Sequence, residues 1–269
     1  TTMVAYYYMA ETNLRFLMGR FAVVVIPVLS AAAAADVLAP QRVRRLALFG
    51  AGKIAPAAIR YLCAVRCFEA IDIVGKGSAR ASALADMLRT MPQFSGTDIR
   101  ASSDSETAVA NADVIVTLTT SDTPVFPGRA VRNGTLVILA GANRPSAREA
   151  DDDLIRRATV FVDHHESCVA RAGDLSIPLQ YGVLAPDRIA GEIGGLFQSA
   201  RPPPSAERGV TVFKSMGVIG QDIALAELVL TRAREYGIGV EFDPVTGDCQ
   251  MSPAAQSSNL ANAMMAGAT

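Results

Sequence analysis

The chain has 269 residues, of which 50% are hydrophobic and 19% are charged, and its formal net charge is −1. This composition is typical of a globular protein with a substantial core, and the nearly neutral charge argues against nucleic acid or another polyanion as a partner. The four cysteines form neither a zinc-ligand pattern nor a disulfide framework, so we expect free thiols, no metal site and a cytoplasmic protein.

The N-terminal segment contains an expected hairpin and an expected helix. Residues 3–18 begin with a tyrosine-rich run and have the pattern of a hairpin. The apolar residues 21–35 resemble part of a signal peptide or a membrane anchor, but Pro27 and Ser30 interrupt them, and signal peptides carry their apolar core closer to the start. We therefore expect a buried helix over Ser30–Leu38, capped by Ser30, and no membrane partner.

Residues 46–58, Leu-Ala-Leu-Phe-Gly-Ala-Gly-Lys-Ile-Ala-Pro-Ala-Ala, predict a strand, a tight turn and a helix. The spacing Gly50-x-Gly52-x-x-Ala55 is that of a dinucleotide-binding turn. The first glycine permits the turn, the second lets a pyrophosphate approach the backbone, and the small third residue lets the helix pack closely. The start of the helix offers free N–H groups to the phosphates. The expected cofactor contacts in this stretch are Gly50, Gly52, Lys53 and Ile54.

After this turn, apolar strands alternate with helical segments. We expect strands at Ala70–Val74, Ile99–Ser102, Asp113–Thr119, Thr135–Ala140, Thr159–Asp163 and Val210–Phe213. We expect helices at Ala79–Arg89, Glu106–Asn111 and Gln221–Tyr236. The alternation predicts parallel βαβ units and an α/β fold with a doubly wound parallel sheet. The residues after Phe242 show little periodicity, and we expect them to lack regular structure.

The residues that follow the Ala70–Val74 strand bear on the choice of cofactor. NAD enzymes usually present an acidic residue at this place, where it bonds the ribose hydroxyls of the adenosine. Here the residue is Gly75, and the candidate cofactor contacts that follow are Lys76, Ser78 and Arg80. A missing carboxylate with cations nearby favours the 2′-phosphate of NADP(H) over NAD(H). The alternative is an ordinary solvated turn.

Small residues follow the next two buried strands. Thr119, Thr120 and Ser121 end the fourth predicted strand, and their size allows a cofactor to approach closely. Ala140 ends the fifth strand and precedes Gly-Ala-Asn-Arg-Pro at 141–145. Because ligands of open α/β sheets lie across the carboxyl ends of the strands, we expect the nicotinamide ring at this loop.

Four ordered motifs resemble those of one protein family. The first is Ala-Asp-Val-Ile-Val-Thr at 112–117 with Thr-Thr-Ser at 119–121 and Pro124, and the second is Gly-Ala-Asn-Arg-Pro at 141–145 with Arg-Glu-Ala-Asp at 148–151. The third is Gly-Asp-Leu at 173–175, and the fourth is Phe-Lys-Ser-Met-Gly at 213–217 with Asp222. Together they are similar to the motifs of the ornithine cyclodeaminase and mu-crystallin family.

The resemblance implies a dinucleotide-binding Rossmann domain joined to a substrate and dimerisation domain, and therefore a homodimer. Residues 1–40 are expected to be an N-terminally short remnant of the latter domain, and residues 41–190 the Rossmann domain. Residues 191–251 are expected to return as a strand and a helix to the substrate side, and residues 252–269 to form a flexible tail. Family chemistry is hydride exchange between nicotinamide and the α-carbon of an amino acid, so the implied partner is a small amino acid or imine.

The chain departs from the family pattern at the substrate end. The family's Arg-Thr pair, whose arginine binds the substrate carboxylate, falls on Ile26 and Pro27 by spacing. The family's acid/base aspartate of cyclodeaminases is Asn143, whose amide cannot exchange a proton near neutral pH. Another cation must then bind the carboxylate, and Arg144, with Lys214, is the candidate. The candidate catalytic residues are therefore Asn143, Arg144 and Lys214.

Several polar residues have two open interpretations. Arg144 either anchors substrate or bonds a neighbouring carboxylate such as Glu149, and Lys214 either contacts a ligand or caps the sheet edge. Asp174 fits a substrate amine or a turn cap equally well. The resemblance implies that Ser215 contacts the nicotinamide carboxamide. The adjacent residues His164 and His165 fit a surface pair better than a metal site.

Three functions are consistent with these patterns. The first is an NAD(P)(H)-dependent oxidoreductase acting at a C–N bond of an amino acid or cyclic imine. The second is a cyclodeaminase-type lyase that recycles bound NAD, which Asn143 argues against. The third is a dinucleotide-binding protein that has lost catalysis, as Ile26 and the short N-terminal part suggest.

Overall fold

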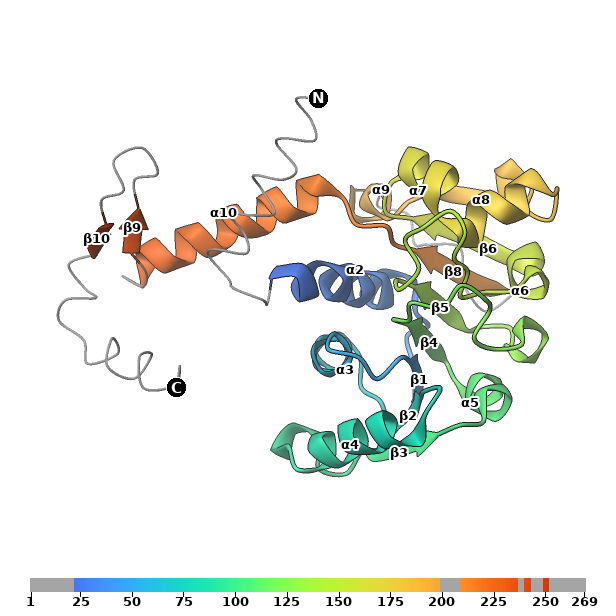
Figure 1. Cartoon of the computed structure of the whole chain (residues 1–269), viewed down its shortest axis with the longest axis horizontal. Coiled ribbons are helices and arrows are strands. Elements are labelled where there is room, and N and C mark those ends of the chain that lie inside the picture. Colours follow the sequence, from blue (N-terminus) through green and yellow to red (C-terminus); the bar gives the residue numbers. More distant parts are fainter. Residues whose placement is uncertain (1–21, 199–208, 237–239, 243–248, 252–269) are drawn as a thin grey trace. The chain divides into compact units, whose positions relative to one another are not determined.

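The computed structural model describes residues 22–198, 209–236, 240–242 and 249–251 (Figure 1). These residues divide into two compact units, one that ends at Val218 and one that begins at Ile219, and each is described by itself. The expected hairpin over residues 3–18 and the expected tail over residues 252–269 lie outside the described residues.

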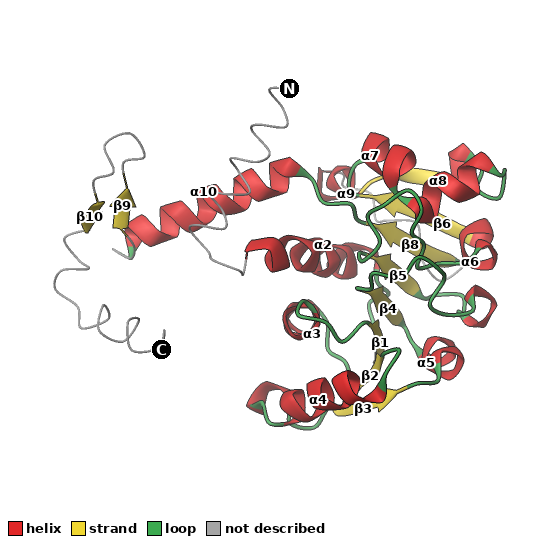
Figure 2. Cartoon of the chain, viewed as in Figure 1, coloured by secondary structure: helices red, strands yellow, loops and turns green. Residues whose placement is uncertain are grey.

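An eight-stranded parallel sheet forms the centre of the first unit (Figure 2). Its strands are β1 (Arg45–Phe49), β2 (Ala70–Val74), β3 (Asp98–Ser102), β4 (Val114–Thr117), β5 (Leu136–Leu139), β6 (Ala158–Val162), β7 (Ile189–Glu192) and β8 (Val210–Lys214). Their order in space is β3-β2-β1-β4-β5-β8-β6-β7. The chain moves outward from β1 to β3 and then returns past β1 to β4. This reversal confirms the predicted doubly wound sheet. In sheets of this kind, ligands bind at the carboxyl ends of the strands beside the reversal, which here are β1 and β4.

Helices cover both faces of the sheet (Figure 1). One face carries α2 (Ala22–Leu38), α3 (Ala55–Val65), α4 (Ser78–Arg89) and α9 (Ile193–Gln198). The other face carries α5 (Ser105–Asn111), α6 (Asp152–Arg157), α7 (His165–Arg171) and α8 (Gly173–Gln180). Short 3-10 helices at Pro92–Phe94, Gly128–Ala130 and Pro186–Arg188 complete the connections.

Strand β1 shows how the sequence fills both cores. Leu46 and Leu48 point into the core under α2, α3 and α4, whereas Ala47 and Phe49 point into the opposite core. The side chains of a strand alternate between the two faces, so a central parallel strand must be apolar at every position. Phe49 also packs against Phe126, with ring centroids 5.1 Å apart.

Helix α2 is longer than the sequence predicts. The helix expected over Ser30–Leu38 is present, but it begins at Ala22, so Ser30 lies inside the helix and is not its N-cap. The helix includes the apolar residues before Ser30, among them Pro27, and residues such as Val28, Ala31 and Ala35 are buried. Among the described helices, none is long and apolar enough to cross a membrane.

Most of the expected strands and helices of the first unit are confirmed. Strand β2 has the predicted bounds, and β3, β4, β5, β6 and β8 each differ from prediction by one or two residues at an end. The sheet continues past residue 190, the expected end of the Rossmann domain, because β7 and β8 pair with β6. Helices α6 to α9 lie in a part of the chain for which we predicted no helix.

The second unit contains α10 (Ile219–Glu235) and an antiparallel pair of short strands, β9 (Val240–Phe242) and β10 (Cys249–Met251). Helix α10 confirms the helix expected over Gln221–Tyr236. The expectation that no regular structure follows Phe242 is wrong, because Cys249–Met251 pairs with Val240–Phe242. Strands of three residues are too short to show an alternating pattern in the sequence.

Candidate functional site

The turn between β1 and α3 requires a glycine at its first position. Gly50 has a φ of +102°, and a Cβ atom there would lie 2.7 Å from the carbonyl oxygen of Leu118. The N–H of Gly50 donates to the oxygen of Val74 at 2.9 Å, and the N–H of Leu118 donates to Phe49 at 2.8 Å. The turn is therefore seated between the ends of β2 and β4, at the point where the strand order reverses.

Gly52 faces open space at the start of α3. A Cβ atom at Gly52 would meet no protein atom within 4 Å. Ala55, the first residue of α3, is fully buried, and its N–H donates to the Gly52 oxygen at 3.1 Å. The first turn of this 11-residue helix contains no acidic residue, and Ile54 provides no side-chain cap. Its N–H groups and positive dipole end are thus available to a phosphate, and Lys53 beside them is exposed.

The end of β2 presents two cations to solvent. Lys76, Ser78 and Arg80 are all exposed, and α4 begins at Ser78 without an acidic residue in its first turn. Within the described ranges, no ion pair involves Lys76 or Arg80. Both side chains are therefore available to pair with an anion near Gly75.

A buried glutamate joins the loops after β4 and β5. One carboxylate oxygen of Glu149 accepts from the N–H and the hydroxyl of Thr119, at 2.8 and 2.7 Å. The other accepts from the N–H groups of Gly141 and Ala142, at 2.8 and 3.0 Å. A Cβ atom at Gly141 would lie 2.2 Å from the Thr119 nitrogen, so only glycine allows this approach. The central place of Glu149 was not among our predictions.

The other small residues expected to contact cofactor lie on the same two loops. Thr120 is exposed, whereas Ser121 is buried and donates its hydroxyl to the oxygen of Thr123 at 2.7 Å. Ala140 is half-buried, and its N–H donates to Thr117 at 3.1 Å. These loops share the carboxyl edge of the sheet with Gly50 and Gly52.

Lys214, a candidate anchor for substrate, is fully buried. Its ammonium forms an ion pair with Asp174 at 2.9 Å and donates to the carbonyl oxygen of Ala142. Asp174 also accepts from the N–H groups of Glu149 and Ala150, at 2.6 and 3.0 Å. The Lys214 ammonium is therefore bonded within the protein, to Asp174 and to the β5 loop. Asp174 accepts hydrogen bonds from the backbone N–H groups that follow this loop.

Ser215 likewise bonds inside the protein. Its hydroxyl donates to Asp163 at 2.9 Å, and the same carboxylate oxygen accepts from the N–H groups of Met216 and Gly217, both at 2.7 Å. Asp163 thereby joins the ends of β6 and β8. The next residue, His164, caps α7, because its Nδ1 accepts from the N–H of Ser167 at 3.3 Å.

The histidine pair does not form a metal site. His164 is half-buried and His165 is exposed. In the part of the chain that the structure describes, no group of three or more His, Cys, Asp or Glu residues could hold a metal ion.

Two of the candidate catalytic residues lie on the exposed loop after β5. Asn143 and Arg144 are both exposed. Arg144 forms an ion pair with Asp122 of the β4 loop at 2.7 Å, and the two side chains are 57% and 66% exposed. Its neighbour is thus Asp122 and not Glu149. An exposed pair of this kind is weak, so a ligand carboxylate can compete for Arg144. Ile26 and Pro27 lie within α2, where only the backbone is described.

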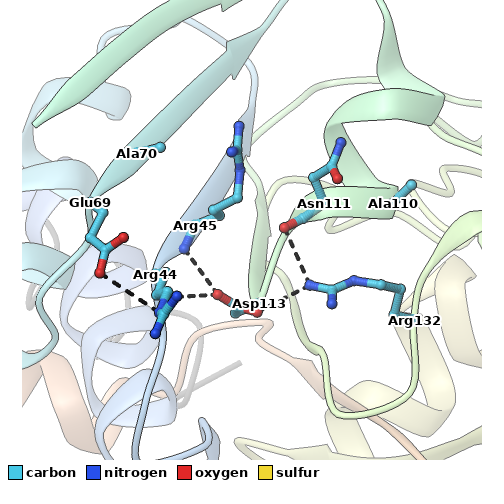
Figure 3. Close-up of a pocket in the computed structure, with 8 residues that line it drawn as sticks. All are labelled: Arg44, Arg45, Glu69, Ala70, Ala110, Asn111, Asp113 and Arg132. Atoms are coloured by element: carbon cyan, nitrogen blue, oxygen red, sulfur yellow. Dashed lines mark hydrogen bonds and ion pairs between the residues drawn. The ribbon is translucent and has the colours of Figure 1, made fainter.

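A separate pocket of about 420 Å³ lies at the amino edge of the sheet, away from these loops (Figure 3). Asp113 at its centre accepts from the N–H groups of Arg44 and Arg45, at 2.7 and 3.0 Å, and pairs with Arg132 at 3.1 Å. Glu69 lies 3.7 Å from Arg44. The side chains of Arg44 and Arg132 thus pair within the pocket, whereas the Arg45 guanidinium pairs with Asp72 outside it, and these bonds join the beginnings of β1, β2 and β4.

The strand order, the Gly50 turn and the open start of α3 define a Rossmann-type α/β protein with a candidate dinucleotide site at the carboxyl edge of its sheet. The model of the ornithine cyclodeaminase/mu-crystallin family matches residues 29–237, and the chain belongs to this family.

Two proteins of known sequence illustrate the relationship. Delta(1)-pyrroline-2-carboxylate reductase of Paracoccus denitrificans is 32% identical over 195 residues, which are 72% of this chain and 61% of that protein. Ketimine reductase mu-crystallin of Mus musculus is 36% identical over 132 residues, which are 49% of this chain and 39% of that protein. The chain therefore spans less than two thirds of the length of these relatives.

Two solved structures share the fold. Thermococcus litoralis Delta(1)-pyrroline-2-carboxylate reductase, in complex with NADH and L-proline, has a TM-score of 0.76 and 25% identity, covering 83% of this chain and 68% of that chain. The iminosuccinate reductase of Paracoccus denitrificans, in complex with NAD+, has a TM-score of 0.73 and 26% identity, covering 82% of this chain and 66% of that chain.

Proposed function

We propose that the protein is an NAD(P)(H)-dependent oxidoreductase that acts at the C–N bond of an amino acid or a cyclic imine. The observation that carries this proposal is the Gly50 turn, which places the open start of α3 at the reversal point of the sheet. A dinucleotide pyrophosphate fits there, because Gly52 leaves space and the helix supplies N–H donors. When bound, the nicotinamide donates or accepts the hydride. The names of the related reductases support the same class of reaction.

The proposal is tested by a turnover screen that supplies NADH or NADPH for the reduction of imines and NAD+ or NADP+ for amino-acid substrates. Delta(1)-pyrroline-2-carboxylate and other cyclic imines are the substrates to try first, with L-proline for the reverse reaction. Net oxidation of the cofactor supports a reductase. Turnover of ornithine without net cofactor consumption points to the cyclodeaminase-type lyase, and tight cofactor binding without any turnover points to a non-catalytic binder.

We propose that NADP(H) is preferred over NAD(H). Lys76 and Arg80 are exposed cations without a described ion-pair partner, and Gly75 carries no carboxylate to repel a 2′-phosphate. In a Lys76→Met/Arg80→Met variant the affinity for NADPH should fall about tenfold, since charge-assisted bonds are lost. The affinity for NADH of the same variant is the internal control and should stay unchanged. Wild-type protein that binds NADH more tightly than NADPH refutes the preference.

We propose that Arg144 anchors the carboxylate of the substrate. It lies on the loop after β5, its side chain is 57% exposed, and among the described residues that side chain bonds only Asp122, which is exposed too. Arg144→Met should lower kcat/KM roughly a hundredfold, the cost of a charge-assisted anchor of 2–3 kcal/mol. Arg156→Met is a matched control, because Arg156 forms a similarly exposed pair with Asp153. If both variants turn over a carboxylate substrate normally, Arg144 only shapes its loop.

We further propose a homodimer that works in the cytoplasm. The described cysteines Cys63, Cys67 and Cys168 are free thiols, as expected in a reducing compartment. Sedimentation equilibrium of the full chain tests the dimer, and a monomer at micromolar concentration refutes it.

A further inference from the structure

Glu149, Asp174 and Lys214, here called the buried triad, link three separate segments behind the candidate cofactor edge. All three side chains are fully buried. Glu149 follows the β5 loop, Asp174 lies in the first turn of α8, and Lys214 ends β8. Burial of charged groups is costly unless hydrogen bonds or an opposite charge compensate it, and each of these three side chains has at least two such partners.

The carboxylate of Glu149 sets the shape of both loops. Each of its oxygens accepts two hydrogen bonds, one pair from Thr119 and the other from Gly141 and Ala142. Every position around the carboxylate is filled by a donor. A glutamine amide cannot replace it, because either rotamer points its NH₂ group at a backbone N–H group.

Asp174 and Lys214 support Glu149 and the β5 loop through further hydrogen bonds. Asp174 fixes the backbone of Glu149 and Ala150 through one oxygen and binds Lys214 through the other. Lys214 in turn donates to the carbonyl oxygen of Ala142, so that the β5 loop is bound on both sides. The loop is then held in one conformation by partners up to 72 residues away in the sequence.

We propose that the buried triad is a positioning device that holds the β4 and β5 loops in the conformation that receives the nicotinamide end of the cofactor. The triad contacts the loops and not the cofactor. This role rests on the proposed function, because it is the proposed function that puts the nicotinamide at these loops. The proposed function places the pyrophosphate and adenosine ends at Gly52 and Gly75. Within the described residues, the side-chain hydrogen bonds of the triad go to Thr119, Gly141, Ala142, Ala150 and the triad itself, and not to those two turns.

The decisive variant is Glu149→Gln, tested by binding of two probes to the full chain. When the loop is less firmly held, a smaller fraction of the protein has the binding-competent loop conformation. The apparent affinity falls in proportion to that fraction. Binding of NADPH, measured by its fluorescence, should weaken about tenfold. Binding of 2′-phospho-ADP-ribose, which lacks nicotinamide, should change less than about twofold. NADH with ADP-ribose replaces this pair if the wild type prefers NADH.

Control variants separate positioning from a general loss of structure. Glu166→Gln makes the same chemical change at an exposed glutamate in the first turn of α7 and should leave both affinities unchanged. If Glu149→Gln does not fold, the double variant Asp174→Asn/Lys214→Met decides. It removes the bond from Lys214 to the Ala142 oxygen and should weaken NADPH binding about threefold, whereas the affinity for the fragment should change less than about twofold.

The outcomes are distinct. Selective loss of NADPH affinity supports the proposal. Equal affinities in variant and wild type, or an equal loss for both probes, overturn it while leaving the proposed function intact. A wild-type protein that binds neither NADPH nor NADH overturns the proposed function, and the positioning role with it.

Discussion

At the scale of single residues, the main feature is the buried ion pair of Lys214 and Asp174. Neither side chain has any exposed surface, and the two charged atoms are 2.9 Å apart. Removing two charges from water is costly, and the pair is tolerated because the remaining bonds to Ala142, Glu149 and Ala150 are also made. We therefore do not retain Lys214 as a substrate anchor, since its ammonium is already bound within the protein.

Breaking this pair from one side should be strongly destabilising. Lys214→Met leaves the Asp174 carboxylate buried without its cation and should lower the free energy of unfolding by about 3–5 kcal/mol. The double variant Asp174→Asn/Lys214→Met removes both charges and should recover part of that loss, because the asparagine oxygen can still accept from Glu149 and Ala150. Urea unfolding of the wild type, Lys214→Met and the double variant measures this loss and its recovery, and a loss below about 1 kcal/mol in Lys214→Met contradicts the structure.

Cysteine reactivity is the second property set by single residues. Burial, followed by the Asp163 carboxylate, raises the pKa of the Cys168 thiol from 9.0 to about 12, and burial raises the pKa of Cys63 to about 11. Cys67 is exposed. At about pH 8, iodoacetamide should therefore label Cys67 before Cys63 and reach Cys168 only after unfolding. Peptide mapping by mass spectrometry reads the order, and early labelling of Cys168 in native protein argues against its burial.

The raised pKa of Cys168 makes the free energy of unfolding depend on pH. The native Cys168 thiol stays protonated up to about pH 12, whereas an unfolded thiol ionises from about pH 9. Its contribution to stability is therefore complete below about pH 9 and is lost as the pH rises toward 12. Cys168→Ala should flatten this part of the stability profile.

At the scale of elements, the turn between β1 and α3 combines positive φ with close packing. An alanine at position 50 would be strained by the positive φ and would also clash, because its Cβ atom would lie 2.7 Å from the carbonyl oxygen of Leu118. Gly96→Ala is a matched control with a φ of +93° and no atom within 4 Å. Backbone strain should lower the free energy of unfolding of both variants by roughly 1 kcal/mol. We expect a clearly larger loss in Gly50→Ala, together with weak NADPH binding. Thermal unfolding and titration compare the two, and equal behaviour contradicts the turn geometry.

Helix α6 depends on a cap that also bonds a distant turn. Asp151 accepts from the N–H of Leu154 at 2.9 Å and from the N–H of Gly128 at 2.7 Å. Asp151→Ala leaves both donors without a partner and should cost about 2–3 kcal/mol. Asp104 caps α5 by accepting from the N–H of Thr107 at 3.0 Å, and hydrogen bonds from Thr107 and Glu106 at this helix start lower the pKa of its carboxyl. Asp104→Ala should lower the free energy of unfolding by less than Asp151→Ala does. Chemical denaturation measures both values, and a larger loss in Asp104→Ala refutes the double role of Asp151.

At the scale of the whole molecule, the proposed cofactor should stabilise the folded state. A ligand at about 100 times its Kd adds about 2.7 kcal/mol to the free energy of unfolding. For a chain of this size, NADPH at that concentration should raise Tm by about 5 °C or more. Differential scanning fluorimetry with and without NADPH measures the shift. An unchanged Tm at every NADPH and NADH concentration contradicts a dinucleotide site.

Family membership also belongs to the whole molecule. The matched region begins in α2 and ends beyond α10, so it contains the whole parallel sheet. The relatives extend over regions without a counterpart in this match, since 61% of the Paracoccus denitrificans reductase is covered. The cofactor edge is therefore the part of the molecule on which the proposals about function rest most securely.

The sequence by itself determined the parallel sheet and the place of the turn. Apolar runs ending in glycine or small polar residues mark β1, β2, β4 and β5, because a strand buried on both faces needs apolar residues at every position. The Gly50 spacing placed the turn for a related reason: only glycine tolerates both a positive φ and a neighbouring strand end.

Only the tertiary structure decided how the polar residues of the site are used. Glu149 meets Thr119 across 30 residues, Asp174 meets Glu149 across 25, and Lys214 meets Asp174 across 40. A local pattern carries no sign of such pairs, since a lysine in a motif looks the same whether its ammonium faces a ligand or a buried carboxylate. The fold settles the question, because burial leaves a charge stable only where partners from other segments surround it.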